Sequence, residues 1–183
     1  MKRMFRLLCV TLLTTLATLS AGSLSGRRAP SFALPDSSMR YYDILDFRGK
    51  VVLVDVMQTT CPHCLTLSKT LEQVKAKYGA KIQILSIVTP PDNAQAVAAF
   101  VGANKVSSPI LFDCGQVAAA YLKVGPQNPS VTVPHLFFID AQGTIVEDFG
   151  GEPASKLSLG AIGAIVDRLL AGGASAAPAP AKK

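Results

Sequence analysis

Two cysteines separated by Pro62 and His63 follow closely on an apolar run at residues 51–56. A run of this kind, rich in β-branched residues, predicts a strand buried on both faces of a sheet. After the motif, apolar residues recur at helical spacing to about residue 78, and proline suits the first position of a helix. The segment therefore predicts a buried strand that delivers Cys61 and Cys64 to the start of a helix, where the helix dipole favours a thiolate.

The spacing of the two cysteines argues for chemistry rather than for stability. The chain contains four cysteines, of which Cys9 lies in the N-terminal apolar stretch. A disulfide stabilises a fold by restricting the unfolded chain, and the loop between Cys61 and Cys64 is too short for this effect. We therefore expect a redox-active pair, with Cys114 as a buried small residue.

The N-terminal residues 1–22 have the pattern of a signal peptide. A basic start is followed by an apolar stretch, which is short for a membrane span, and then by small residues that suit cleavage. The pattern predicts a periplasmic or secreted protein, or one anchored by an uncleaved segment, in a compartment where disulfides persist. Residues 23–28 are interpreted as a linker, 29–171 as one domain, and 172–183 as a disordered Ala/Pro tail.

The net charge excludes a nucleic-acid-binding role. The formal charge of the chain is +6, but residues 1–22 hold three basic residues and no acidic one, so that the remainder carries +3. Nucleic-acid binding requires a clustered basic surface, and the sequence shows none. No metal or cofactor is expected, since a lone Cys-x-x-Cys supplies only half of the ligands of a structural zinc site.

Strands and helices alternate along the domain, which predicts an α/β fold. Proline-punctuated extended segments before residue 43 predict a hairpin ahead of the apolar run. Further strands are expected at 82–88, 110–112, 133–140 and 145–149, and helices at 62–78, 92–103, 115–122 and 155–171.

The order of these elements, the Cys-x-x-Cys motif at a strand-to-helix junction and Val133-Pro134 before a late strand resemble the thioredoxin superfamily. Three further features resemble its extracytoplasmic TlpA-like thiol–disulfide oxidoreductases, which are related to the AhpC/TSA redoxin group. These features are the Ala-Pro-x-Phe-x-Leu-Pro opening at Ala29, the lead-in at 47–54 and an extra strand–helix unit across 81–103. The resemblance implies a thioredoxin-like fold, with a central mixed β-sheet flanked by helices, an N-terminal hairpin and an inserted strand–helix unit. It also implies thiol–disulfide exchange with protein substrates.

The position of each cysteine predicts its role. Cys61, at the start of the helix, is the expected nucleophile, and Cys64, one turn further, is the expected resolving thiol. Pro62 occupies the first helical position, where a missing N–H has no consequence. A partly protonated His63 would stabilise the thiolate and make the pair more oxidising.

Asp55 is the one acidic residue in the apolar strand that precedes the motif. Burial of a carboxylate there is unfavourable unless it has a partner or a function. The resemblance implies that Asp55 moves a proton for Cys64. The alternative is an ion pair with a buried lysine, Lys81 or Lys123.

The resemblance also places a substrate-binding edge beside Cys61. It implies that Pro134 follows a cis peptide bond and that the backbone of Val133 pairs with an extended substrate. Thr60 stands where thioredoxins carry a tryptophan, and the chain has no Trp. The expected partners are protein thiols or disulfides and a redox partner protein, with a membrane-bound electron donor as an option, and we expect a monomer.

Two other functions remain open from the sequence. A copper-handling protein of the same fold would use Cys61, Cys64 and His135, since thiolates suit Cu(I). A thiol peroxidase of the redoxin group is the second, although the usual peroxidase pattern is absent around Cys61. The direction of electron flow is also open, because His63 favours an oxidant and the TlpA-like context favours a reductant.

Overall fold

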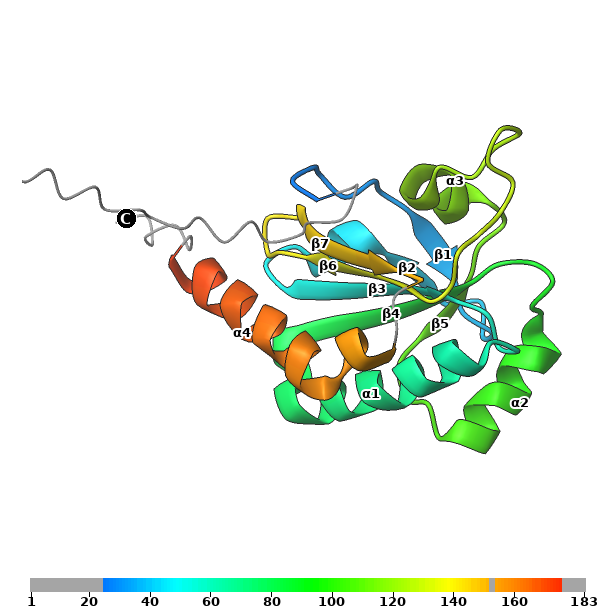
Figure 1. Cartoon of the computed structure of the whole chain (residues 1–183), viewed down its shortest axis with the longest axis horizontal. Helices are drawn as coiled ribbons and strands as arrows, with labels where there is room; N and C mark the ends of the chain where they lie inside the picture. The colour runs from blue at the N-terminus through cyan, green and yellow to red at the C-terminus, as the bar shows by residue number, and fades with distance from the viewer. Residues whose placement is uncertain (1–24, 152–153, 176–183) are drawn as a thin grey trace, which may run out of the picture.

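A five-stranded mixed sheet forms the centre of the structure, a computed structural model that describes residues 25–151 and 154–175 (Figure 1). The strands are β1 (Ala33–Pro35), β2 (Tyr41–Asp43), β3 (Val51–Met57), β4 (Ile82–Val88), β5 (Ile110–Phe112), β6 (His135–Ile139) and β7 (Ile145–Gly150). The order in the main sheet is β5-β4-β3-β6-β7, and β1 pairs with β2 in a separate hairpin. β3, β4 and β5 are parallel, whereas β6 is antiparallel to both of its neighbours.

Helices and the hairpin cover the two faces of the sheet. The helices are α1 (Pro62–Tyr78), α2 (Ala94–Asn104), α3 (Gln116–Leu122) and α4 (Leu159–Ser175). α1 and α4 lie together against one face, where Leu71 of α1 packs with Leu53 and Phe138 of the sheet (Figure 1). The hairpin and α3 cover the other face, where Tyr121 packs with Val54.

β3 is the central strand, and all seven of its residues are buried. Successive side chains of a strand point to opposite faces. Val51 and Leu53 accordingly belong to the α1 side, whereas Val52 and Val54 belong to the hairpin side. The apolar run of the sequence is thus explained, because β3 has packed layers on both faces.

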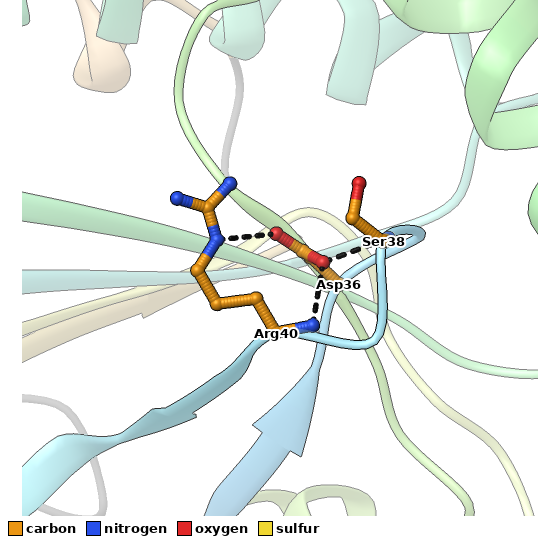
Figure 2. A network of polar contacts seen from close by, with 3 residues as sticks. All are labelled: Asp36, Ser38 and Arg40. Carbon is orange, nitrogen blue, oxygen red and sulfur yellow. Dashed lines mark hydrogen bonds and ion pairs between the residues drawn. The ribbon is translucent and has the colours of Figure 1, made fainter.

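The turn of the hairpin is built on Asp36. Its carboxylate accepts hydrogen bonds from the backbone N–H groups of Ser38 at 2.8 Å and Arg40 at 3.1 Å, and from Nε of Arg40 at 3.3 Å (Figure 2). Asp36 also forms a β-bridge with Leu111 of β5. The turn of the hairpin therefore reaches β5, the strand at one edge of the main sheet.

Most of the predicted boundaries are confirmed. α1 ends at Tyr78 before Gly79, which has a φ of 55°. The structure also contains a short 3-10 helix, η1 (Ile44–Phe47), which begins after Asp43, whose side chain accepts from the Leu45 N–H. The last helix differs. The 3-10 helix η3 (Ala154–Leu157) precedes α4, and α4 continues four residues beyond the predicted end at residue 171, to Ser175.

The predicted linker at 23–28 is partly ordered against the sheet. The Gly26 N–H donates to the Ile145 carbonyl at 2.7 Å, the Ile145 N–H donates to the Arg27 carbonyl at 2.9 Å, and Arg28 bridges to Thr144. The predicted leader at 1–22 and residues 176–183 of the predicted tail lie outside the described residues. Within the described ranges, every helix is too short or too polar to cross a bilayer.

Candidate active site

Cys61 is the N-cap of α1, as the sequence predicts. Its Sγ accepts a hydrogen bond from the backbone N–H of Cys64 at 3.3 Å, and Pro62 occupies the first helical turn. A bond from the Cys61 N–H to the Gln58 carbonyl, at 3.2 Å, closes the turn that joins β3 to α1. The N-terminal amides of a helix stabilise a thiolate, so this geometry suits a nucleophilic sulfur.

The two cysteines differ in exposure. Cys61 is half-buried, whereas Cys64 has 0% of its surface exposed. Burial raises the pKa of Cys64, a hydrogen bond with Cys61 and the negative charge of Asp55 raise it further, and a backbone hydrogen bond from Gln58 opposes them. Cys64 therefore stays protonated until a base removes its proton.

Asp55 is the buried acid beneath the pair. It is completely buried in β3, and neither carboxylate oxygen has a hydrogen bond within the described residues. Burial raises its pKa to about 7, and the hydroxyl of Ser86, its register partner on β4, offsets part of this shift without forming a bond of ordinary geometry. A carboxyl group with a pKa near 7 exchanges its proton readily at neutral pH.

The ion pair considered as the alternative role of Asp55 is not present. Lys81 and Lys123 are both exposed, and neither contributes to the pKa of Asp55. Among the described residues, Asp55 instead acts on Cys64, because the negative charge of the Asp55 carboxylate raises the pKa of the Cys64 thiol. The acid and the buried thiol are therefore electrostatically coupled.

The predicted substrate edge also lies at this site. The Val133–Pro134 peptide bond is cis, as the resemblance to the thioredoxin superfamily implies. Val133 packs in the same apolar cluster as Cys61 and Cys64, around Met57. Within the part of the chain that the structure describes, neither the N–H nor the C=O of Val133 forms a hydrogen bond.

The remaining predicted site residues lie on the rim. Thr60, Pro62 and His63 are all exposed. Cys61 between them is half-buried, and Thr60 stands where the resemblance would place a tryptophan.

His135 is not part of this cluster. Its Nε2 lies 3.0 Å from Oδ2 of Asp148, its ring stacks on Phe137 at 4.3 Å, and a Cβ added at Gly150 would meet its Nδ1 at 2.3 Å. Burial lowers the pKa of His135, and the Asp148 carboxylate opposes this effect. Both ring nitrogens thus face β7 rather than the cysteines, and no group of three metal-ligating side chains occurs in residues 25–151 and 154–175.

The structure corrects the prediction for Cys114, which is exposed rather than buried. The buried position belongs to its neighbour Asp113, whose carboxylate accepts from the backbone N–H groups of Val117 at 3.0 Å and Ala118 at 2.9 Å. Asp113 has to face inward to cap α3, and this turns Cys114 outward.

One contact at the site was not foreseen from the sequence. The carboxylate of Asp92 accepts hydrogen bonds from the backbone N–H of Thr59, at 2.8 Å, and from the Thr59 hydroxyl. The adjacent residue, Asn93, caps α2, so the carboxylate of Asp92 is not needed for that role. The sequence signal for this contact is the presence of two adjacent polar residues, Asp92 and Asn93, before a helix that needs only one of them as its cap.

Comparison with known proteins agrees with this geometry. The model of the AhpC/TSA family matches residues 25–148. A thiol-disulfide oxidoreductase, ResA of Bacillus thuringiensis (strain Al Hakam), is 28% identical over 131 residues, which are 72% of each chain.

Two solved structures share the fold. A thioredoxin family thiol:disulfide interchange protein from Chlorobium tepidum TLS has a TM-score of 0.67 and 19% identity, over 79% of this chain and 96% of its own. A secreted Mycobacterium tuberculosis disulfide oxidoreductase has a TM-score of 0.59 and 21% identity, over 76% of this chain and 95% of its own. The predicted thioredoxin-like fold is thereby confirmed, as is the class of enzyme, a thiol–disulfide oxidoreductase. The chain belongs to the AhpC/TSA family.

Proposed function

We propose that the Cys61–Cys64 pair exchanges a disulfide with protein substrates outside the cytoplasm. The observation that carries this proposal is the arrangement of the two sulfurs at the start of α1. Cys61 is half-buried and accepts the Cys64 N–H, while Cys64 is completely buried behind it. One sulfur is thus open to a substrate, and the other reacts only with its neighbour.

In the reducing direction, the Cys61 thiolate attacks one sulfur of a substrate disulfide. The substrate S–S bond breaks, a mixed disulfide forms, and the first substrate sulfur leaves as a thiolate that takes up a proton. Cys64 then gives its proton to Asp55 and attacks the Cys61 sulfur, which releases the second substrate sulfur. Two electrons pass from the pair to the substrate, and the same steps in reverse oxidise a substrate dithiol.

Asp55 supports the second step. A thiol whose pKa is raised by burial needs a base, and Asp55 is the buried acid whose charge reaches Cys64. Ionised Asp55 accepts the proton, and the neutral acid returns it in the reverse direction.

The substrate is an extended segment of protein that lies along Val133. The open N–H and C=O of Val133 pair with this segment as with an added strand. The exposed residues Thr60, Pro62 and His63 then contact the substrate on the other side of the sulfur.

Export rests on the signal-like residues 1–22 and on the secreted relative. A redox partner protein, either soluble or anchored in the membrane, restores the pair after each cycle, and the chain acts as a monomer. Its direction follows from the reduction potential of the pair. A reduction potential of about −270 mV corresponds to a reductase, and one of about −120 mV to an oxidant.

The test is a trapping experiment with an exported protein that contains one disulfide. Cys64→Ser should accumulate the mixed disulfide, whereas Cys61→Ser should form none, and Cys114→Ser should behave as the wild type. Mixed disulfides of Cys61→Ser through Cys64, or none with Cys64→Ser, would contradict the assigned roles.

The family match favours one second candidate, a thiol peroxidase. It predicts that hydrogen peroxide oxidises Cys61 faster than a substrate disulfide does, which stopped-flow mixing of each oxidant with the reduced protein measures directly.

A further inference from the structure

Asp92 holds the turn that presents Cys61. Its Oδ2 accepts from the Thr59 N–H at 2.8 Å, and its Oδ1 accepts from the Thr59 hydroxyl. The two residues are 33 positions apart, so the contact joins the connection after β4 to the connection after β3. Asp92 therefore reaches the active-site turn from a different part of the chain.

The turn itself has few other constraints. β3 ends at Met57 and α1 begins at Pro62. Between them, the backbone bond from Cys61 to Gln58 closes the turn from within. Among the described residues, Asp92 is the hydrogen-bond partner of both the N–H and the hydroxyl of Thr59, two residues before the nucleophile.

The acceptor is well suited to this task. An ionised carboxylate only accepts hydrogen bonds, and its bonds are shorter and stronger than those of neutral groups. The Asp92 N–H is bound to the Thr89 carbonyl at 3.1 Å. The next residue, Asn93, caps α2 by accepting from the N–H groups of Gln95 and Ala96, both at 3.0 Å. Asp92 is thus fixed on its own side and is not needed as the helix cap.

We propose that Asp92 is a positioning residue of the redox pair. By holding Thr59, it fixes the place of the Cys61 sulfur relative to the α1 amides and to Val133, and so sets both the rate of exchange and the reduction potential of the pair. This inference rests on the proposed function only in the choice of reaction. A displacement of a reacting group by about 1 Å costs up to about a hundredfold in rate.

Four variants separate the contributions of the two hydrogen bonds between Asp92 and Thr59. Asp92→Ala removes both bonds and should slow the reaction of Cys61 with oxidised glutathione by roughly tenfold. It should also shift the glutathione equilibrium of the pair by at least about fivefold, because the sulfur leaves its best place at the helix amides. Thr59→Val keeps the N–H bond and should show about a third of the loss in rate. Thr59→Ser retains both bonds. Asp92→Asn keeps its oxygen as acceptor for the Thr59 N–H, and its amide NH2 donates to the Thr59 hydroxyl instead of accepting from it, so both variants should stay within about threefold of the wild type.

Asn93→Ala is the matched control. It removes two hydrogen bonds from the adjacent residue but leaves the bonds to Thr59 in place. It should lower the melting temperature at least as much as Asp92→Ala does, without changing the rate or the equilibrium. If Asn93→Ala and Asp92→Ala changed them equally, or if a folded Asp92→Ala matched the wild type in both, Asp92 would not be a positioning residue.

Glutathione keeps this test separate from the proposed function. A wild type that equilibrates with glutathione but forms no mixed disulfide with proteins would refute the proposed substrate class, and the comparison of the variants would still decide the role of Asp92.

Discussion

The buried carboxyl of Asp55 allows a quantitative test by pH-dependent unfolding. Burial raises its pKa from 3.8 to about 7. Between these pH values, the carboxyl group of Asp55 ionises in the unfolded state but stays protonated in the folded state. The free energy of unfolding therefore falls as the pH rises through this window and stays lower above it. At about 1.4 kcal/mol per pKa unit, the total loss is about 4 kcal/mol, as an upper value.

The perturbation is Asp55→Asn, which has the same shape but never ionises. Near pH 4 the free energies of unfolding of the two reduced proteins should differ by a small amount. As the pH rises to 8, the free energy of unfolding of the variant should increase relative to that of the wild type by up to about 4 kcal/mol. Urea unfolding at pH steps from 4 to 8 measures this difference, and the other titrating groups cancel because both proteins share them.

Ser86→Ala provides the control for the same site. Ser86 lowers the pKa of Asp55 in part, so its removal should extend the loss of stability to a higher pH. A difference between wild type and Asp55→Asn that is independent of pH would refute the reasoning, since Asp55 would then ionise in the folded state as it does in water.

Three further predictions follow from other contacts. Asp55→Asn should remove the rise near pH 7 in the rate at which Cys64 resolves a mixed disulfide, measured by rapid quench; an unchanged pH profile between 6 and 8 would exclude Asp55 as the base. Gly150→Ala should lower the free energy of unfolding in urea by about 1 to 3 kcal/mol, because the new Cβ would lie 2.3 Å from Nδ1 of His135. Adding His135→Ala should recover part of this loss, and strictly additive losses in the double variant would contradict the steric clash. Tyr121→Phe should cost about 1 kcal/mol, since the hydroxyl donates to the Pro30 carbonyl at 2.7 Å; equal stability would show that water replaces this bond.

The β3–α1 segment could be predicted from the sequence because its signals are local. The apolar run, Pro62 and the closing Gly79 act within one strand and one helix, and they fix where Cys61 lies. The helical periodicity after the motif also places Cys64 on the buried side. The two cysteines and the strand and helix that position them therefore all come from one continuous segment of the chain.

Contacts between distant segments were beyond such reasoning. Thr59 and Asp92 meet only because β3 and β4 are parallel neighbours, and His135 finds Asp148 only through the register of β6 and β7. Local rules also misjudged the last helix, which was predicted to end at residue 171, just before Gly172, but continues to Ser175. A glycine weakens a helix by about 1 kcal/mol but does not by itself terminate it.

The segment before β3 has a consequence for how the protein behaves at high concentration. Residues 26–28 bond to the start of β7, and Asp36 bridges to Leu111 of β5 at the opposite edge, so one continuous stretch of chain contacts both edge strands of the main sheet. Unshielded borders recruit strands from other molecules and lead to aggregation. In the binding mode that we propose, the backbone of Val133 would then be the place where a foreign strand pairs, and a chain paired there would lie beside Cys61.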